Sequence, residues 1–214
     1  MSDTTIRRTV HHHAGLAPYR VLAGFALFGA VLTVILDMAM WFIIDGYNPM
    51  AQTISELAAG PHSWIQDLGI CTFAVGIACL AIGFTLRSDG DRHRNVAMRT
   101  ALGLLSAVIL TLALYNEYGD GDFGGVEIHL WLVGAIYLLV PAIFWLLSGL
   151  PAMRRSLFQN GGKAVAVAWL LLAPLFFVVP DTWDGAFERV LAMVMIAGVV
   201  GGAFYLYRQS DHAD

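Results

Sequence analysis

The chain of 214 residues is poor in charge, since only 13% of its residues are Asp, Glu, Lys or Arg and the sole lysine is Lys163. A soluble globular domain carries about a quarter charged residues and is just under half apolar. Here the hydrophobic fraction is 58%. This composition excludes an ordinary soluble domain, and no basic tract points to nucleic-acid binding.

Cysteine is also scarce: the chain holds two, Cys71 and Cys79, eight positions apart in one apolar run. Helical rise separates them by about 12 Å, which is too far for a disulfide, so we interpret both as packing residues. No apolar run holds a pair of histidines, which argues against haem. Lys163 lies at a helix end, which argues against a retinal-type Schiff base. The tract His11–His13 is left out of the predicted site.

What the chain does have is long apolar runs. A helix needs about 20 apolar residues to cross the hydrocarbon core, and the first run is too long for a cleaved signal peptide and has no small-residue cleavage site. The sequence therefore predicts an all-α polytopic membrane protein, with a bundle of six transmembrane helices at residues 20–207 between tails 1–19 and 208–214. The runs are Val21–Ile44, Trp64–Leu86, Val96–Tyr115, Val126–Leu150, Ala164–Val179 and Val190–Tyr207.

Basic residues fall almost entirely on one side of this six-helix pattern. When the connections are assigned alternately to two sides, 11 of the 12 Lys and Arg residues lie on the first side and only Arg189 lies on the other. Cytoplasmic loops retain basic residues during insertion. We therefore predict a multi-pass plasma-membrane protein with both termini in the cytoplasm. The outer side collects the acids, two histidines and several hydroxyl groups.

The first outer connection contains signals for a short helix. Asn48 followed by Pro49 is a good helix start, and Thr53 with Glu56 three residues later matches a capping box. Either start is possible. Gly60–Pro61 should end the helix, with glycine free to take the left-handed conformation. We expect a short helix on the outer surface between the first two spans.

One acid, Asp37, lies well inside a predicted span. A charge at that depth is costly and needs a partner, a water path or a proton. Asp37 is therefore either a proton-binding or ligand-binding carboxylate, or one half of a structural contact with a neighbouring helix.

Other polar residues of the outer side are candidates for catalysis or ligand binding. Ser55, Glu56 and His62 lie in the first outer connection, and His129 begins the fourth run. Histidine near a membrane surface can bind metal, shuttle protons or cap a helix. His62 and His129 could contribute to a divalent-metal site, although their spacing matches no metal motif. A Ser55/His/Asp nucleophilic arrangement is possible in principle, but the absence of a glycine-flanked nucleophile elbow argues against it. Helix capping alone would also explain Ser55 and Glu56.

Arg189 faces many acids and should pair with one of them, Glu56 or Asp37. Glu188 and Asp184 precede it, and Asp184 can cap the sixth helix. We therefore predict a ligand-binding cluster of Asp37, Glu56, His129, Glu188 and Arg189. Separately, an aromatic belt should anchor the outer side; it consists of Tyr47, Trp64, Tyr118, Trp131 and Trp183.

The block Tyr47–Trp64, YNPMAQTISELAAGPHSW, resembles a bacterial and archaeal family of six-helix membrane proteins, domain of unknown function nine-nine-eight. The Glu127-Ile-His129 start of the fourth helix and the segment Gly185–Arg189 fit it too. This resemblance spans residues 20–207 and implies an architecture but no reaction. A weaker likeness runs to the Frag/DRAM/Sfk membrane proteins, whose Ile-Ser-Asp or Ile-Ser-Glu element is comparable to Ile54–Glu56. Members of that group are linked to lipid remodelling and autophagy.

Three functions remain open from the sequence. The first is a lipid-facing enzyme or lipid-binding protein whose polar cluster opens to the outer leaflet. The second is a non-catalytic membrane scaffold or partner subunit. The third is a small proton-coupled transporter that uses Asp37. Against it, the six helices show no inverted repeat of the kind on which many transporters are built. Membrane lipids are the expected partners, and a homo- or hetero-oligomer within the membrane is compatible with each function.

Overall fold

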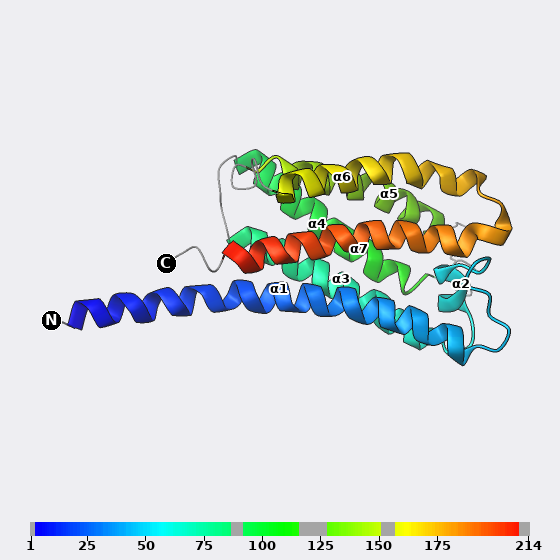
Figure 1. Cartoon of the computed structure of the whole chain (residues 1–214), viewed down its shortest axis with the longest axis horizontal. Coiled ribbons are helices and arrows are strands. Elements are labelled where there is room, and N and C mark those ends of the chain that lie inside the picture. Colours follow the sequence, from blue (N-terminus) through cyan, green and yellow to red (C-terminus); the bar gives the residue numbers. More distant parts are fainter. Residues whose placement is uncertain (1–2, 87–91, 116–127, 151–156, 210–214) are drawn as a thin grey trace.

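The computed structural model describes residues 3–86, 92–115, 128–150 and 157–209, and all regular structure in these ranges is helical. This confirms the all-α prediction. Figure 1 traces the helices in chain order. The elements are α1 (Asp3–Ile43), α2 (Ile54–Ala59), α3 (Ser63–Leu86), α4 (Arg92–Leu112), α5 (Ile128–Ser148), α6 (Leu157–Leu172), the 3-10 helices η3 (Ala173–Val178) and η4 (Asp181–Trp183), and α7 (Asp184–Gln209).

Six of the described helical segments are long and apolar enough to cross a membrane, as the sequence predicted. Their bounds are Pro18–Ile43, Ser63–Leu86, Arg92–Leu112, Ile128–Ser148, Leu157–Val178 and Asp181–Arg208. Several helices begin before their apolar runs, because the polar first turns of a span can lie in the interfacial region. Helix α1 begins at Asp3 instead of near Val21, and α7 begins at Asp184 instead of near Val190.

The early start of α7 matters for the site. Asp184 is the first residue of the helix, where its charge complements the helix dipole. Glu188 and Arg189 therefore lie one helical turn inside α7, not before it. At the end of α6, Pro174 stands near the start of η3, and the α-helix changes to a 3-10 helix there. A proline lacks the amide that continues an α-helix.

Helix α2 begins at the second of its two possible starts. Thr53 is the N-cap, and it forms a complete capping box with Glu56. Asn48 instead forms a turn, in which its side chain accepts a hydrogen bond from the amide of Met50 at 3.1 Å. The helix ends at Gly60, as predicted, but the left-handed conformation expected for this glycine is wrong, because the C-cap is extended with φ −91°. The residue before a proline is pushed towards extended backbone, and the left-handed residue is His62.

The spans form a ring in chain order. Each packs against the next, and α7 packs against α1 and closes the ring. Figure 1 places the start of α1 and the end of α7 at one end of the bundle and α2 at the other. We call the α2 end the outer end. Three exposed tryptophans of the predicted aromatic belt lie at this end, namely Trp64, Trp131 and Trp183; Tyr118 lies outside the described residues.

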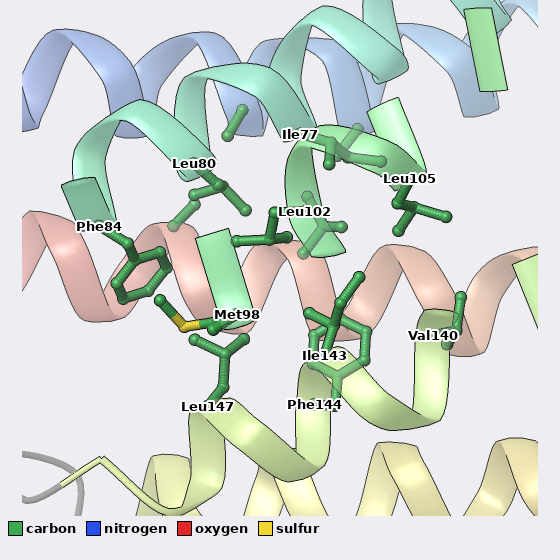
Figure 2. Close-up of a cluster of buried hydrophobic side chains, with 14 of the residues drawn as sticks. Ile77, Leu80, Phe84, Met98, Leu102, Leu105, Val140, Ile143, Phe144 and Leu147 are labelled. Carbon is green, nitrogen blue, oxygen red and sulfur yellow. The ribbon is translucent and has the colours of Figure 1, made fainter. Parts of the chain in front are cut away.

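Small residues let the helices approach closely. A Cβ added to Gly29 of α1 would lie 2.4 Å from the carbonyl oxygen of Thr72 in α3, and one added to Gly83 would lie 2.6 Å from Leu206 of α7. The Gly83 contact joins α3 to α7 near the end that holds the termini. The central core joins α3, α4 and α5 in Figure 2. Its labelled side chains are Ile77, Leu80, Phe84, Met98, Leu102, Leu105, Val140, Ile143, Phe144 and Leu147.

Candidate functional site

The outer half of the ring encloses a cavity of about 530 Å³. Each of the six spans and α2 contribute to its wall, and α2 covers it at the outer end through Ile54, Ser55 and Ala58. Most of the wall is apolar, including Val133 and Ile196. Most of the polar side chains lie towards α2. The polar lining residues are Thr33, Asp37, Thr53, Ser55, Gln66, His129, Tyr137, Glu188 and Arg189.

Arg189 forms a two-point ion pair with Asp37, so of its two predicted partners Asp37 is the one found. The distances are 3.0 Å from Nε to Oδ2 and 3.0 Å from Nη2 to Oδ1. Both side chains are 13% exposed. A planar guanidinium matches a carboxylate at two points, and such pairs are among the strongest polar contacts in proteins. Asp37 thereby has the partner that a charge inside a span requires.

The same guanidinium holds the connection between α1 and α2. Arg189 Nη1 donates to the carbonyl oxygens of Pro49 at 3.0 Å and Gln52 at 2.9 Å, and to that of Gly185 at 3.0 Å within α7. The guanidinium carbon also lies 5.4 Å from the ring centroid of Trp41, at a distance that suits a cation–π contact. Arg189 therefore ties α1, the first outer connection and α7 together.

Tyr47 belongs to this contact set, although the sequence suggested only a membrane anchor. Its hydroxyl accepts a hydrogen bond from Arg189 Nη2 and donates one to the carbonyl oxygen of Gln52 at 2.9 Å. Burial raises the pKa of Tyr47 to about 12, against the lowering effect of Arg189. The phenol thus stays protonated and keeps donating to the backbone. Tyr47 and Arg189 are 142 positions apart in the sequence, so no local sequence pattern predicts this contact.

Gly185 lets the first outer connection lie directly on α7. A Cβ at this position would stand 2.0 Å from the carbonyl oxygen of Gln52 and 2.8 Å from that of Pro49. One residue later, the amide of Ala186 donates to the carbonyl oxygen of Met50 at 3.0 Å. This close approach fixes the position of α2 over the cavity.

A second set of polar contacts joins α2, α5 and α7. Ser55 Oγ lies 3.2 Å from Nε2 of His129 and 3.5 Å from Oε1 of Glu188. The other ring nitrogen of His129, Nδ1, lies 3.0 Å from the carbonyl oxygen of Tyr115. Glu188 also accepts a hydrogen bond from the amide of Ile54. All three side chains line the cavity, so helix packing brings together residues that are 74 and 133 positions apart.

Two predicted site residues do not line the cavity. Glu56 accepts a hydrogen bond from the amide of Thr53 at 2.7 Å as part of the capping box. His62 is an exposed turn residue with φ 65°, and its carbonyl oxygen accepts from the amide of Ile65. Within the described ranges, no three His, Cys, Asp or Glu side chains are grouped to hold a metal ion. Glu127, beside His129 in the sequence, lies outside those ranges.

Two polar atoms in the cavity wall lack a partner, and the sequence analysis did not single out either residue. Gln66 in α3 is only 2% exposed, and its Oε1 accepts no hydrogen bond from any described residue. The buried Nε1 of Trp41 in α1 is a donor, and it donates to no described residue. A buried polar atom without a partner costs about 1–3 kcal/mol. A glutamine inside an apolar run was the available signal for this feature.

Comparison with known proteins agrees with this architecture. The family model described as "Protein of unknown function (DUF998)" matches residues 27–205, which include most of the first and last spans, all of the four spans between them, α2 and every cavity residue named above. The searches of curated proteins and of solved structures gave no match. The chain is a multi-pass membrane protein, and it belongs to the family of proteins of unknown function DUF998.

Proposed function

We propose that this protein binds a neutral, single-chain amphipathic lipid in the cavity, with the lipid headgroup beneath α2. The observation that carries this proposal is the cavity itself, which is about 530 Å³ in volume and apolar except at its outer end. Ligand sites in proteins are concave, mostly apolar and fitted with a few polar groups that orient the ligand. A cavity that is polar at one end and apolar along the rest has the form of a single-chain lipid.

The charges at the polar end favour a neutral headgroup. Asp37 and Arg189 compensate each other through their ion pair, and Glu188 places a further carboxylate in the cavity wall. An anionic headgroup would be repelled by this carboxylate. A headgroup with hydroxyl or amide groups can instead form hydrogen bonds with Ser55, His129 and Glu188, which line the polar end of the cavity.

The ion pair also bears on the role of Asp37. Both of its carboxylate oxygens accept from Arg189, so we assign Asp37 and Arg189 to holding α2 over the cavity. Ligand contact then falls to Ser55, His129 and Glu188. This assignment leaves little support for a proton carrier at Asp37, because protonation would break the pair.

The lipid would enter sideways from the membrane. Met38 of α1 and Met193 of α7 both line the cavity, they are 46% and 51% exposed, and their helices are neighbours in the ring. Flexible, unbranched methionine side chains adapt to different ligand shapes. With both termini in the cytoplasm of a plasma-membrane protein, this route would open to the outer leaflet.

The test is to introduce a tryptophan that fills the cavity at one position of α7, and to introduce the same residue at a second position outside the cavity as the control. Ala192 of α7 lines the cavity, whereas Ala197 is exposed and does not. The purified protein in detergent would be titrated with a monoacylglycerol carrying a fluorescent acyl chain. We expect saturable binding to the wild type and to Ala197→Trp, and a loss of at least about tenfold in affinity for Ala192→Trp, which corresponds to about 1.4 kcal/mol.

Equal affinities for the two tryptophan variants would overturn the cavity as the binding site. An absence of saturable binding to the wild type, with either the monoacylglycerol or a fluorescent fatty acid, would favour the scaffold function instead. Tighter binding of the fatty acid than of the monoacylglycerol would contradict the preference for a neutral headgroup.

A further inference from the structure

The contact between Ser55 and His129 has a fixed direction. The carbonyl oxygen of Tyr115 can only accept a hydrogen bond, so the ring nitrogen facing it, Nδ1 of His129 at 3.0 Å, carries the proton. In neutral His129 the other nitrogen, Nε2, then has a free lone pair. This lone pair faces Ser55 Oγ at 3.2 Å and can accept the hydroxyl proton.

This arrangement contains the parts of an activated serine. A nucleophilic hydroxyl needs a base within hydrogen-bond reach, and the base needs a third group that orients it. Here the serine is Ser55, the base is His129 and the orienting group is the carbonyl of Tyr115. Ser55 Oγ has one proton and two possible acceptors, Nε2 of His129 at 3.2 Å and Oε1 of Glu188 at 3.5 Å, and the contact with His129 is the shorter one. The carboxylate of Glu188 adds a negative charge close to the imidazolium that forms when His129 takes the proton, and an opposite charge favours that ion.

The pair lies in the wall of the cavity and not on the protein surface. Ser55 and His129 are both part-buried and both line the space that we assign to the lipid. Their place at the polar end corresponds to the junction between a lipid headgroup and its chain, where an acyl ester is found.

We propose that Ser55 is the nucleophile, and His129 the general base, of a hydrolase that cleaves the acyl ester of a neutral single-chain lipid. This proposal rests on the lipid-binding function above and adds a reaction to it.

The reaction consumes one water molecule and proceeds in two steps. Ser55 Oγ attacks the ester carbonyl carbon while its proton passes to Nε2 of His129, and the carbonyl π electrons move to the oxygen. When they return, the ester C–O bond breaks, and the alcohol leaves with the proton from His129. Water then attacks the acyl-serine and gives a proton to His129. The bond between Ser55 Oγ and the acyl carbon breaks, the proton returns to Ser55, and the fatty acid leaves.

A fluorophosphonate probe tests the nucleophile without requiring lipid binding. A small fluorophosphonate with a fluorescent tag would be added to the purified protein in detergent, and the modified peptide would be identified by mass spectrometry. We expect covalent labelling at Ser55. Ser55→Ala should abolish labelling, and Ser63→Ala, a serine of the same end that does not line the cavity, should leave it unchanged. His129→Gln, whose amide can still donate to Tyr115, should slow labelling by at least about 100-fold, as loss of a general base does.

The lipid reaction supplies the second measurement. Wild-type protein should release fatty acid from a monoacylglycerol, whereas Ser55→Ala should still bind this lipid saturably and release none. A wild type with no modified Ser55, or labelling that persists at the wild-type rate in His129→Gln, would overturn the hydrolase and leave lipid binding standing. Labelling of Ser55 with no saturable lipid binding would instead overturn the proposed binding function, and fatty-acid release by Ser55→Ala would exclude Ser55 as the nucleophile.

Discussion

Asp37 and Arg189 are 152 positions apart in the sequence, yet they form a two-point ion pair between the first and the last span of the bundle. Each side chain is 13% exposed. In such a setting the charge of one residue is compensated chiefly by the other, and removing one partner leaves an unpaired charge. The pair also closes the helical ring, since α1 and α7 are its first and last members.

Asp37→Asn should therefore destabilise the protein strongly. Breaking a buried ion pair from one side costs about 3–5 kcal/mol, and Arg189 would keep its charge without an anionic partner. The double variant Asp37→Asn/Arg189→Gln should recover part of this loss, because neither charge remains. Thermal unfolding in detergent measures both effects.

Asp45→Asn is the control, since Asp45 is an exposed acid a few residues beyond the same helix. A surface change of this kind alters stability by less than about 0.5 kcal/mol. Asp37→Asn as stable as Asp45→Asn would show that the pair is not structural. Asp37 would then regain its place as a candidate ligand- or proton-binding carboxylate.

Much of the fold could be predicted from periodic apolar runs and local signals. The six spans, the short helix α2 and the Thr53 capping box each depend on residues close together in the chain, and the structure has all of them. The pairing of Asp37 with Arg189 was one of two predicted alternatives. It could be anticipated because one acid inside a span and one base on the outer side leave few partners.

The rest of the site depends on contacts between helices that no local pattern encodes. The place of Tyr47 under Arg189 and the contact of Ser55 with His129 follow from how α2 lies across the ring. The sequence did not predict the buried position of Gln66, because a lone glutamine changes the mean hydropathy of an apolar run very little.

Gly185→Ala should displace α2 from its position over the cavity. The new Cβ would stand 2.0 Å from the carbonyl oxygen of Gln52, which is backbone and cannot move without the whole connection. We expect a lower unfolding temperature and weaker binding of the fluorescent monoacylglycerol. Gly201→Ala in the same helix meets nothing within 4 Å and should raise stability by up to about 1 kcal/mol, the helix-propensity difference between the two residues. Equal behaviour of the two variants would contradict the close approach at Gly185.

Gln66→Leu should stabilise the protein. The substitution removes a buried oxygen that has no partner among the described residues, a defect that costs about 1–3 kcal/mol. Ile70→Leu, in the same helix, conserves volume and should change stability little. Thermal unfolding in detergent compares the two variants, and a Gln66→Leu protein no more stable than the wild type would contradict an unpartnered oxygen at this position.

The orientation in the membrane can be tested with single cysteines. Cys71 and Cys79 would first be replaced by alanine, because both are free thiols. Cysteine introduced at Asp45, which is exposed at the α2 end, should react with an impermeant thiol reagent in intact cells. Cysteine at Ser88 should react only after the membrane is opened, because its connection belongs to the basic side that stays in the cytoplasm. The reverse pattern would place the cavity's polar end on the cytoplasmic side.

Alkaline pH should reduce the stabilising effect of Tyr47. At neutral pH, Tyr47→Phe loses the hydrogen bonds to Gln52 and from Arg189, at a cost of about 1 kcal/mol each. The pKa of Tyr47 is raised by burial to about 12 in the folded protein, against about 10 in an unfolded chain.

The folded state therefore holds the phenol proton more tightly than the unfolded state. The corresponding stability is fully present below pH ~10 and is lost as pH rises from ~10 to ~12. The difference in unfolding temperature between the wild type and Tyr47→Phe should consequently shrink between pH ~8 and pH ~11, as followed by thermal unfolding in detergent. A difference that stays constant or grows over this range would mean that Tyr47 ionises at least as readily in the folded protein as in the unfolded chain. Its buried contact with Arg189 would then be incorrect.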